Sequence, residues 1–82
     1  MEFDKNDTME KVAAIVMEQL HVSKEDIQEA SEFHDLGADS LDMVEIVLKL
    51  EDVFGMKIGE EDAERFHNVD EVVDYIHKRR TK

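Results

Sequence analysis

The segment LGADSLDMVEIVLKLEDVFG, residues 36–55, predicts the central helix of the fold. This helix is expected to run from Asp39 to Phe54, because aspartate is a favourable N-cap and Gly55 is a favourable stop. Asp42 falls in its first turn, where the helix dipole favours negative charge. The other elements of the chain are therefore expected to pack around residues 39–54.

The apolar side chains of this helix are too numerous for one buried face. Nine of the fifteen residues from Ser40 to Phe54 are apolar. At 100° per residue, the side expected to be core contains Met43, Val47, Leu50 and Phe54. The two flanks contain Leu41, Val44 and Leu48 on one edge, and Ile46 and Val53 on the other. Either the helix is buried on most sides, or part of this apolar surface is exposed for a partner.

The first third of the chain predicts one helix and one long connection. Amphipathic spacing predicts a helix from Thr8 to Leu20, capped by Asp7 or Thr8. Its buried face is expected to contain Met9, Val12, Ala13, Val16 and Leu20. Residues 21–38 show no sustained period, although Ser23 could cap one isolated turn. A connection of this length is usually functional or pinned by its own side chains, here Val22, Ile27, Phe33 and Leu36.

Two more helices are expected after residue 55. Residues 60–66 predict a short acidic helix with Ala63 and Phe66 facing inward. The last helix is expected to begin at Asn68, with Glu71 at the capping-box position, and to bury Val69, Val72, Val73 and Ile76. No segment alternates with period two for long enough to form a strand. The expected fold is all-α, a small four-helix bundle of three main helices and a short third helix, in a single domain over residues 1–82.

The composition limits the possible partners. The chain of 82 residues has 22 acidic and 10 basic residues, a net charge of −12. This charge argues against nucleic acid and anionic membranes and favours basic protein partners. There is no cysteine, which fits a reducing cytoplasm and leaves no thiol nucleophile or thiolate metal ligand. No apolar run approaches the roughly 18 residues that span a membrane, so no membrane insertion is expected.

Acidic residues are concentrated around the central helix. Residues 39–64 contain nine acidic and two basic residues, a net charge of −7. Such a run is either a solvated face or a docking face for arginine and lysine side chains. The sequence leaves both interpretations open.

Ser40 is the one hydroxyl at the start of the central helix. A catalytic serine needs a general base and an oxyanion hole, but the four histidines are scattered and Gly-x-Ser-x-Gly is absent. A hydrolase is therefore not expected. A phosphorylation site, a serine without a role and an attachment point remain. Attachment fits best, because a phosphate ester there would lie at the positive end of the helix dipole.

Residues 36–55 resemble the acyl carrier protein family. The triplet Asp39-Ser40-Leu41 is that family's signature for attachment of 4′-phosphopantetheine, and Leu-Gly-Ala before it and Val-Glu-Ile-Val, Leu-Glu-Asp and Phe-Gly after it strengthen the match. The resemblance extends over most of the chain, including EEDAE at residues 60–64 and VDEVVDYI at 69–76. It departs at Gly59, where proline is common, at Val53, where an acid is frequent, and at Lys49, which interrupts the acidic face.

The resemblance implies a carrier rather than an enzyme. Ser40 would receive 4′-phosphopantetheine from coenzyme A through a Mg²⁺-dependent phosphopantetheinyl transferase, the holo-acyl-carrier-protein synthase. The terminal thiol of that arm would carry acyl chains as thioesters. The family positions that meet basic patches on partner enzymes correspond to Asp39, Leu41, Asp42, Val44, Glu45, Leu48 and Glu51, extended by Glu60, Glu61 and Glu64. The acyl chain would lie against Val47, Leu50, Phe54, Ile58, Ala63, Phe66 and Tyr75, each of which is equally consistent with ordinary core.

Two levels of alternative remain open. Within the family, a monomeric carrier of type II fatty acid synthesis in the cytoplasm is expected. A carrier for polyketide, lipid A, D-alanyl or aminoacyl transfer is the main rival. Outside it, an acidic interaction module or a divalent-cation-binding protein is possible, although no twelve-residue loop fits the EF-hand pattern. No specific metal site is expected.

Overall fold

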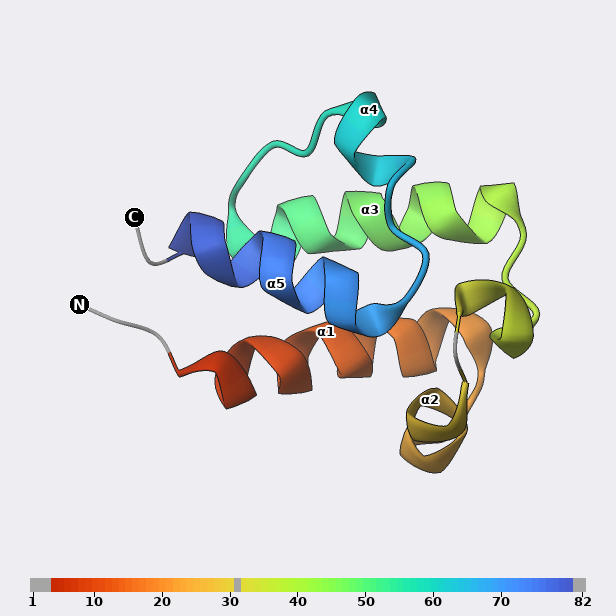
Figure 1. Cartoon of the computed structure of the whole chain (residues 1–82). Coiled ribbons are helices and arrows are strands. Elements are labelled where there is room, and N and C mark those ends of the chain that lie inside the picture. Colours follow the sequence, from red (N-terminus) through yellow and green to blue (C-terminus); the bar gives the residue numbers. More distant parts are fainter. Residues whose placement is uncertain (1–3, 31, 81–82) are drawn as a thin grey trace.

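The computed structural model describes residues 4–30 and 32–80, and every regular element within these ranges is a helix (Figure 1). The α-helices are α1 (Lys5–Leu20), α2 (Lys24–Glu29), α3 (Ser40–Phe54), α4 (Glu60–Ala63) and α5 (Val69–Arg80), and a 3-10 helix, η1, covers Phe33–Leu36. The all-α class is confirmed. The four-helix description is not confirmed, because the long connection contains a fifth helix, α2.

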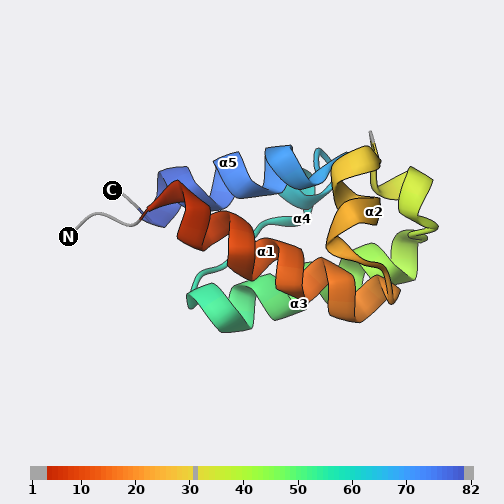
Figure 2. The same cartoon turned by 90° about the horizontal axis from the view of Figure 1, so that it is seen from below.

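The three long helices α1, α3 and α5 form the body of the molecule (Figures 1 and 2). The one-turn helix α4 lies above α3 and α5, and α2 lies beyond the C-terminal half of α1 in both views. The two described ends of the chain, at the start of α1 and the end of α5, lie side by side. The start of α3 is at the opposite end of the molecule.

Helix α1 begins at Lys5, three residues before the expected start. Its N-cap is Asp4, whose Oδ1 accepts a hydrogen bond of 2.8 Å from the Asn6 backbone N–H. The prediction that Asp7 or Thr8 caps this helix is wrong. Both residues belong to α1 itself, and the side chain of Thr8 is fully buried. The added turn is polar, so hydrophobic periodicity gave no signal for it.

The long connection is more regular than its sequence pattern indicated. Ser23 and Asp26 form a capping box, with hydrogen bonds of 3.2 Å to Ser23 Oγ and 3.0 Å to Asp26 Oδ2. This box starts the six-residue helix α2 where only one isolated turn was expected. Ile27 of α2 and Phe33 and Leu36 of η1 pack on the core as expected. A helix this short has too few residues to show a period of 3.6.

The core lies where α1, α3 and α5 meet. Its fully buried side chains are Val12, Val16, Ile46, Leu50, Val72, Val73 and Ile76. On α3 the centre of the buried face is therefore Ile46 with Leu50, whereas the expected core residues Met43, Val47 and Phe54 are only half-buried. On α1 the buried face includes Ile15, and Met9 is 39% exposed although it was expected inside. The buried faces differ from the expected ones because α1 packs against α2, α3 and α5, and a helical wheel of one helix does not show where its neighbours lie.

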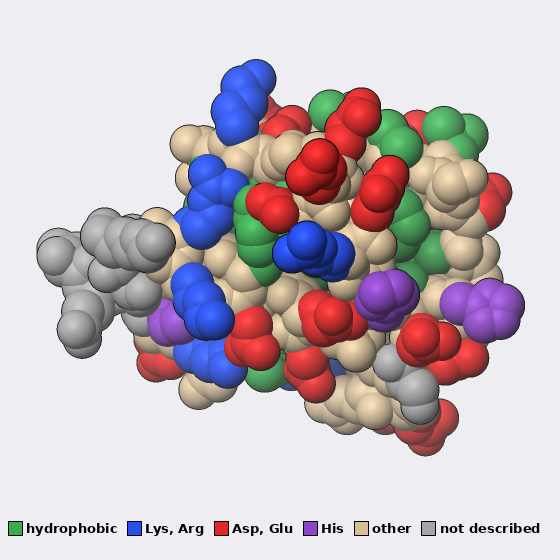
Figure 3. Space-filling model, turned by 45° about the horizontal axis from the view of Figure 1, so that its top comes forward, with side chains coloured by type: hydrophobic (Ala, Val, Ile, Leu, Met, Phe, Trp, Pro, Cys, Tyr) green, Lys and Arg blue, Asp and Glu red, His purple; other side chains and the backbone are tan. Residues whose placement is uncertain are grey.

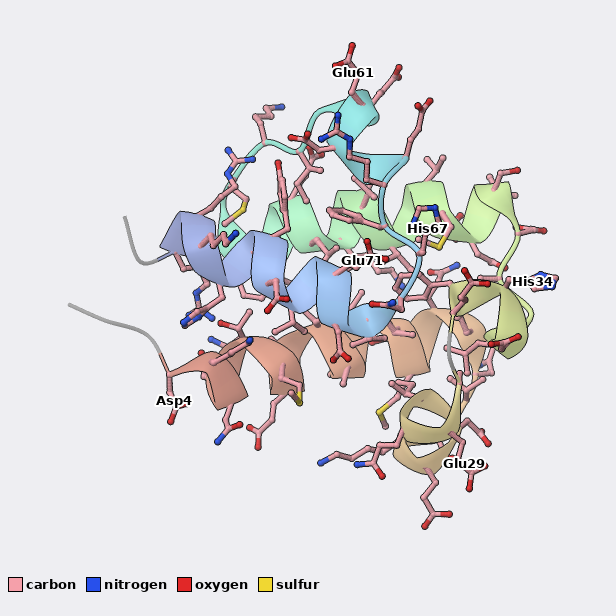
Figure 4. The ribbon with its side chains drawn as sticks, viewed as in Figure 1. Asp4, Glu29, His34, Glu61, His67 and Glu71 are labelled. Carbon is pink, nitrogen blue, oxygen red and sulfur yellow. The ribbon has the colours of Figure 1, made fainter. Side chains whose placement is uncertain are left out.

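Helices α4 and α5 begin near the expected positions. Helix α4 ends at Ala63 rather than 66, and Phe66 beyond it is buried. At the start of α5, Asn68 Oδ1 accepts from the Glu71 N–H at 2.8 Å. The Glu71 side chain accepts from the His67 N–H at 3.2 Å, one residue earlier than a standard capping box requires (Figure 4).

Candidate functional site

The segment that leads into α3 is held rigidly. Gly37 has φ 80°, a left-handed conformation that glycine adopts without strain, and its N–H donates to the His34 carbonyl at 3.0 Å. Phe33 is buried, and its N–H donates to the His67 carbonyl at 2.7 Å. The Ala38 N–H donates back to the Phe33 carbonyl at 3.3 Å. The residues before Ser40 are therefore fixed to the segment between α4 and α5.

Ser40 is the first residue of α3 and is exposed. Asp39 and Asp42 form a capping box around it. The Asp42 N–H donates to Asp39 Oδ1 at 2.9 Å, and the Asp39 N–H donates to Asp42 Oδ2 at 3.2 Å. The Ser40 hydroxyl makes no hydrogen bond to any residue in the described ranges, so no general base is placed on it. The site presents an accessible oxygen on a fixed helix start, which suits chemical attachment better than nucleophilic catalysis.

The capping role of Asp39 gives a direct test of the helix start. Asp39→Ala is expected to lower the free energy of unfolding by about 1 kcal/mol, because the N-cap acceptor is lost. Asp39→Asn is expected to leave stability almost unchanged, because asparagine caps as well as aspartate. Thermal unfolding followed by circular dichroism measures both. Equal destabilisation by the two variants would show that the charge, not the cap, stabilises α3.

The face of α3 opposite the core is apolar and exposed. Leu41, Val44 and Leu48 are 67%, 55% and 57% exposed, so the alternative of a helix buried on most sides is wrong. In Figure 3, acidic side chains lie beside hydrophobic ones on one face of the molecule. The exposed acids of α3 and α4 and of the residues next to them include Asp39, Glu45, Glu60, Glu61 and Glu64. Most of the basic side chains in the same view lie at its left, and one lies near the centre among the acidic ones. Exposed apolar groups ringed by like charge are typical of a docking surface.

The acids expected on this surface differ in their surroundings. Glu51 is half-buried, and its Oε2 accepts a hydrogen bond of 2.7 Å from the Ile58 N–H. This carboxylate therefore holds the segment that joins α3 to α4 against α3. Gln19 of α1 donates to Asp42 Oδ1 at 3.4 Å and also to Glu45 Oε2. Gln19 could not be predicted as a partner of these acids, because only the packing of α1 on α3 brings the side chains together. Glu60 and Glu61 of α4 and Glu64 after it are exposed, as are Asp39 and Glu45. Glu61 projects outward from α4 (Figure 4).

The seven residues expected to line an acyl-chain pocket belong to the closed core. Leu50, Ile58 and Phe66 are buried, and the other four pack against the same cluster, namely Val47, Phe54, Ala63 and Tyr75. A hollow of about 540 Å³ lies instead between α1, α2, η1 and the start of α5. A shallower one of about 380 Å³ lies at the end of α3. None of the seven residues lines either hollow.

The described ranges contain neither a metal-binding cluster nor a membrane-spanning helix. Residues 4–30 and 32–80 contain no group of three or more histidine, aspartate or glutamate side chains arranged to hold a metal ion. The calcium-sensor alternative therefore has no ligand cluster to rest on in these ranges. Over the same residues, no helix combines the length and the apolar character needed to cross a membrane.

Comparison with known proteins identifies the relatives of this chain. Residues 10–76 match the family model described as phosphopantetheine attachment site. An acyl carrier protein of Chlamydia muridarum (strain MoPn / Nigg) is 48% identical over 69 residues, which are 83% of this chain and 90% of that protein. An acyl carrier protein of Nitratidesulfovibrio vulgaris (strain DP4) is 46% identical over 68 residues, 82% and 90% of the two chains. The family match includes the whole of α3 and the residues that fix its start.

Proposed function

The chain belongs to the acyl carrier protein family, and from this premise we propose that it carries growing acyl chains for type II fatty acid synthesis. Members of the family are carriers rather than catalysts, and phosphopantetheine is their prosthetic group. We assign the attachment point to Ser40. The observation that carries this assignment is the exposed hydroxyl of Ser40, which makes no hydrogen bond to the described residues. It lies at a helix start held by the Asp39–Asp42 capping box.

The chemistry of attachment requires Ser40 to supply an oxygen to a phosphorus atom. The Ser40 oxygen forms a new bond to the phosphorus of the pantetheine phosphate, and the pyrophosphate bond of coenzyme A breaks. Adenosine 3′,5′-bisphosphate leaves, and the hydroxyl proton must go to a base. Asp39 and Asp42 are adjacent, but each already accepts a backbone N–H of the cap. The base is therefore expected to come from the transferase. Once bound, the arm supplies the thiol that this cysteine-free chain lacks.

The same face that presents Ser40 is proposed to dock the partner enzymes. Its apolar strip of Leu41, Val44 and Leu48 would enter a partner's apolar surface, while the surrounding acids pair with arginine and lysine. The acids of this docking face are Asp39, Asp42, Glu45, Glu51, Glu60, Glu61 and Glu64. The transferase and the basic-patch enzymes of fatty acid synthesis would use one overlapping surface, each meeting a monomeric single-domain carrier in the cytoplasm.

The docking face predicts different effects for two equally exposed side chains of α3. Leu48→Ala is expected to weaken binding of the transferase about tenfold, the loss of one buried leucine anchor. Val53→Ala removes a side chain that is 52% exposed, close to the 57% of Leu48, but on the other flank. It is expected to leave binding unchanged. Affinity measured by calorimetry tests this, with melting temperature showing that both variants fold. Equal effects on affinity would remove the apolar strip from the proposal.

The pathway is decided by which acyl group the loaded protein accepts. The dense acids of α3 and α4 favour the fatty acid system, and carriers for polyketide, lipid A, D-alanyl or aminoacyl transfer are the alternative. Charging the phosphopantetheine-bearing protein with enzymes and donors of each system distinguishes them. Efficient loading by fatty acid enzymes alone supports the proposal. Preferential loading with D-alanyl or aminoacyl groups would overturn the pathway and leave the carrier function standing.

A further inference from the structure

Helix α4 has little to hold it in place by itself. It has one turn, its N-cap Gly59 has no side chain to accept an N–H, and none of its residues is fully buried. Three acidic residues, Glu60, Glu61 and Asp62, crowd that single turn. Isolated helices of this length are not stable in water. Its position over the core must therefore come from contacts made by neighbouring segments.

Two side chains of α5, one helical turn apart, supply these contacts. Tyr75 Oη donates to Asp62 Oδ2 at 2.8 Å. Arg79 Nη1 lies 2.6 Å from Tyr75 Oη and 2.6 Å from the Lys57 carbonyl oxygen, and donates to both. The Arg79 guanidinium also lies 5.4 Å from the centre of the Tyr75 ring. The chain is thus held to α5 on both sides of the start of α4, at Lys57 and at Asp62.

The apolar part of the same contact covers the core. The edge of the Tyr75 ring packs on Phe66, with the ring centres 5.2 Å apart and the planes at 72°. Ile58 and Phe66, which flank α4, are 7% and 8% exposed. These residues belong to the set expected to surround an acyl chain, and none of them lines either of the two hollows described above. A guest between α3 and α4 therefore requires residues 57–66 to move, which requires the polar contacts to break.

We propose that Tyr75, Asp62 and Arg79 form a latch that controls access of the acyl chain to the core beneath α4. The proposal rests on the carrier function and names the contacts that regulate it. A closed state that keeps these hydrogen bonds competes with an open state that can accept a guest. A guest shifts that equilibrium only by its preference for the open state. Weakening the latch should therefore increase the fraction of acyl chain held inside.

The latch can first be tested without any cargo. Tyr75→Phe removes the hydroxyl and keeps the ring on Phe66. In the full-length protein without phosphopantetheine, amide hydrogen exchange over residues 57–66 is expected to accelerate roughly tenfold. The loss of a hydrogen bond to a charged group makes local opening of this segment easier by about that factor. Asp62→Asn should accelerate the same amides. Asp52→Asn, which removes an equal charge from an exposed position on α3, should not.

Two outcomes of the exchange experiment would overturn the latch. Unchanged exchange over residues 57–66 in both variants would show that the hydrogen bonds do not hold α4. An equal acceleration in α1 and α3 would show general destabilisation rather than a local release. If Tyr75→Phe folds poorly, Asp62→Asn alone decides the result, because its side chain is only partly buried and lies outside the core cluster.

The second test uses the loaded protein. Intact mass first shows whether the arm is on Ser40. If it is not, the proposed function fails and the gating proposal falls with it, while the exchange data still report on the contacts.

With the arm attached, a long acyl chain ending in a water-sensitive fluorophore should report a drier environment in Tyr75→Phe than in the parent. A short acyl chain that cannot reach α4 should show no difference. A long chain unaffected by the substitution would reduce the latch to a structural contact.

The single tyrosine of the chain offers a direct check of the geometry. Burial raises the pKa of Tyr75 above its ordinary value of 10.0, and the hydrogen bond to Asp62 raises it further, while Arg79 lowers it. Because the chain has one tyrosine and no tryptophan, an absorbance titration at alkaline pH reads this group alone. Asp62→Asn should move the pKa down toward 10.0. No movement would place the hydroxyl away from Asp62 in solution and contradict the latch.

Discussion

A Ser40→Ala protein is expected to accept no phosphopantetheine and to fold like the parent. The hydroxyl is the proposed attachment atom, so its removal leaves no acceptor on the helix start. It is also exposed and makes no hydrogen bond to the described residues, and surface substitutions of this kind change stability by about 0.5 kcal/mol or less. The protein is incubated with coenzyme A, Mg²⁺ and a broad-specificity transferase. Intact mass then shows whether one phosphopantetheine has been added.

A second serine provides the matched control. Ser23 also begins a helix next to acidic residues, but it is the N-cap of α2 and accepts the Asp26 N–H. Ser23→Ala is expected to weaken α2 by about 1 kcal/mol and to be loaded fully. Loading of the Ser40→Ala protein would place the arm elsewhere and reject the proposed site. Loss of the helical signal in that variant would instead contradict the exposed position of Ser40.

The start and end of α3 could be predicted from sequence because both depend on local chemistry. Asp39 caps the helix through backbone N–H groups only a few residues away, and Gly55 ends it with a φ of 62°. Such contacts need no knowledge of the rest of the fold. The same holds for Asn68 at the start of α5. The proposed attachment residue, Ser40, lies at one of these locally determined positions. It could be proposed from the sequence because the Asp39-Ser40-Leu41 triplet resembles the family's signature.

The buried faces and the polar contacts between helices could not be predicted in the same way. Ile46 is fully buried and Met43 only half-buried. Helix α3 packs against α1, and the sequence of α3 alone does not show which of its sides α1 covers. Asp62 looks like one more solvated acid in an acidic run, and only the folded structure places it beside Tyr75. The basic residues in the last turn of α5 lie where the helix dipole favours positive charge, and the sequence around Arg80 indicates nothing more than that. Arg80 has a different and larger role.

Arg80 joins three helices at the end of the molecule remote from Ser40. Its side chain is 8% exposed, its Nη1 donates to the buried Thr8 Oγ1 at 2.9 Å, and its Nη2 lies 3.1 Å from Asp7 Oδ2. The guanidinium also lies 5.0 Å from the centre of the Phe54 ring of α3. Because His77 Nδ1 is also within 3.3 Å of Thr8 Oγ1, the hydroxyl is surrounded by partners from α5.

Arg80→Ala is expected to lower the free energy of unfolding by about 2–3 kcal/mol. The loss combines one part-buried hydrogen bond to Thr8, the contact with the Phe54 ring and the packing of the side chain. The Asp7 pair adds little, because Asp7 is 43% exposed. For a domain of this size the melting temperature should fall by roughly 10–20 °C. Urea unfolding followed by circular dichroism measures the change.

Arg65→Ala is the matched control, since Arg65 is exposed in the segment after α4. It is expected to change stability by about 0.5 kcal/mol or less. The stability of Arg80→Lys should lie between those of Arg80→Ala and Arg65→Ala. A lysine ammonium group can pair with Asp7, but it lacks the planar guanidinium that reaches Thr8 as well. If Arg80→Ala were as stable as Arg65→Ala, the contacts among α1, α3 and α5 at this end would not stabilise the fold.

The pH dependence of the stability lost in Arg80→Ala separates the contribution of the Asp7 ion pair from that of the contacts with Thr8 and Phe54. Hydrogen bonds with Lys11 and then Arg80 lower the pKa of Asp7 below its ordinary value of 3.8. The Asp7 carboxylate therefore binds a proton less readily in the folded state than in the unfolded state. The stability that Asp7 contributes is fully present above pH 3.8 and is lost as the pH falls through the lower folded pKa of this carboxyl group.

The difference in unfolding free energy between the parent and Arg80→Ala should therefore narrow over that acid range and then level off. It levels off because the contacts of Arg80 with Thr8 and Phe54 do not depend on the protonation of Asp7. A difference that stays constant with pH would show that Asp7 takes no part in the effect.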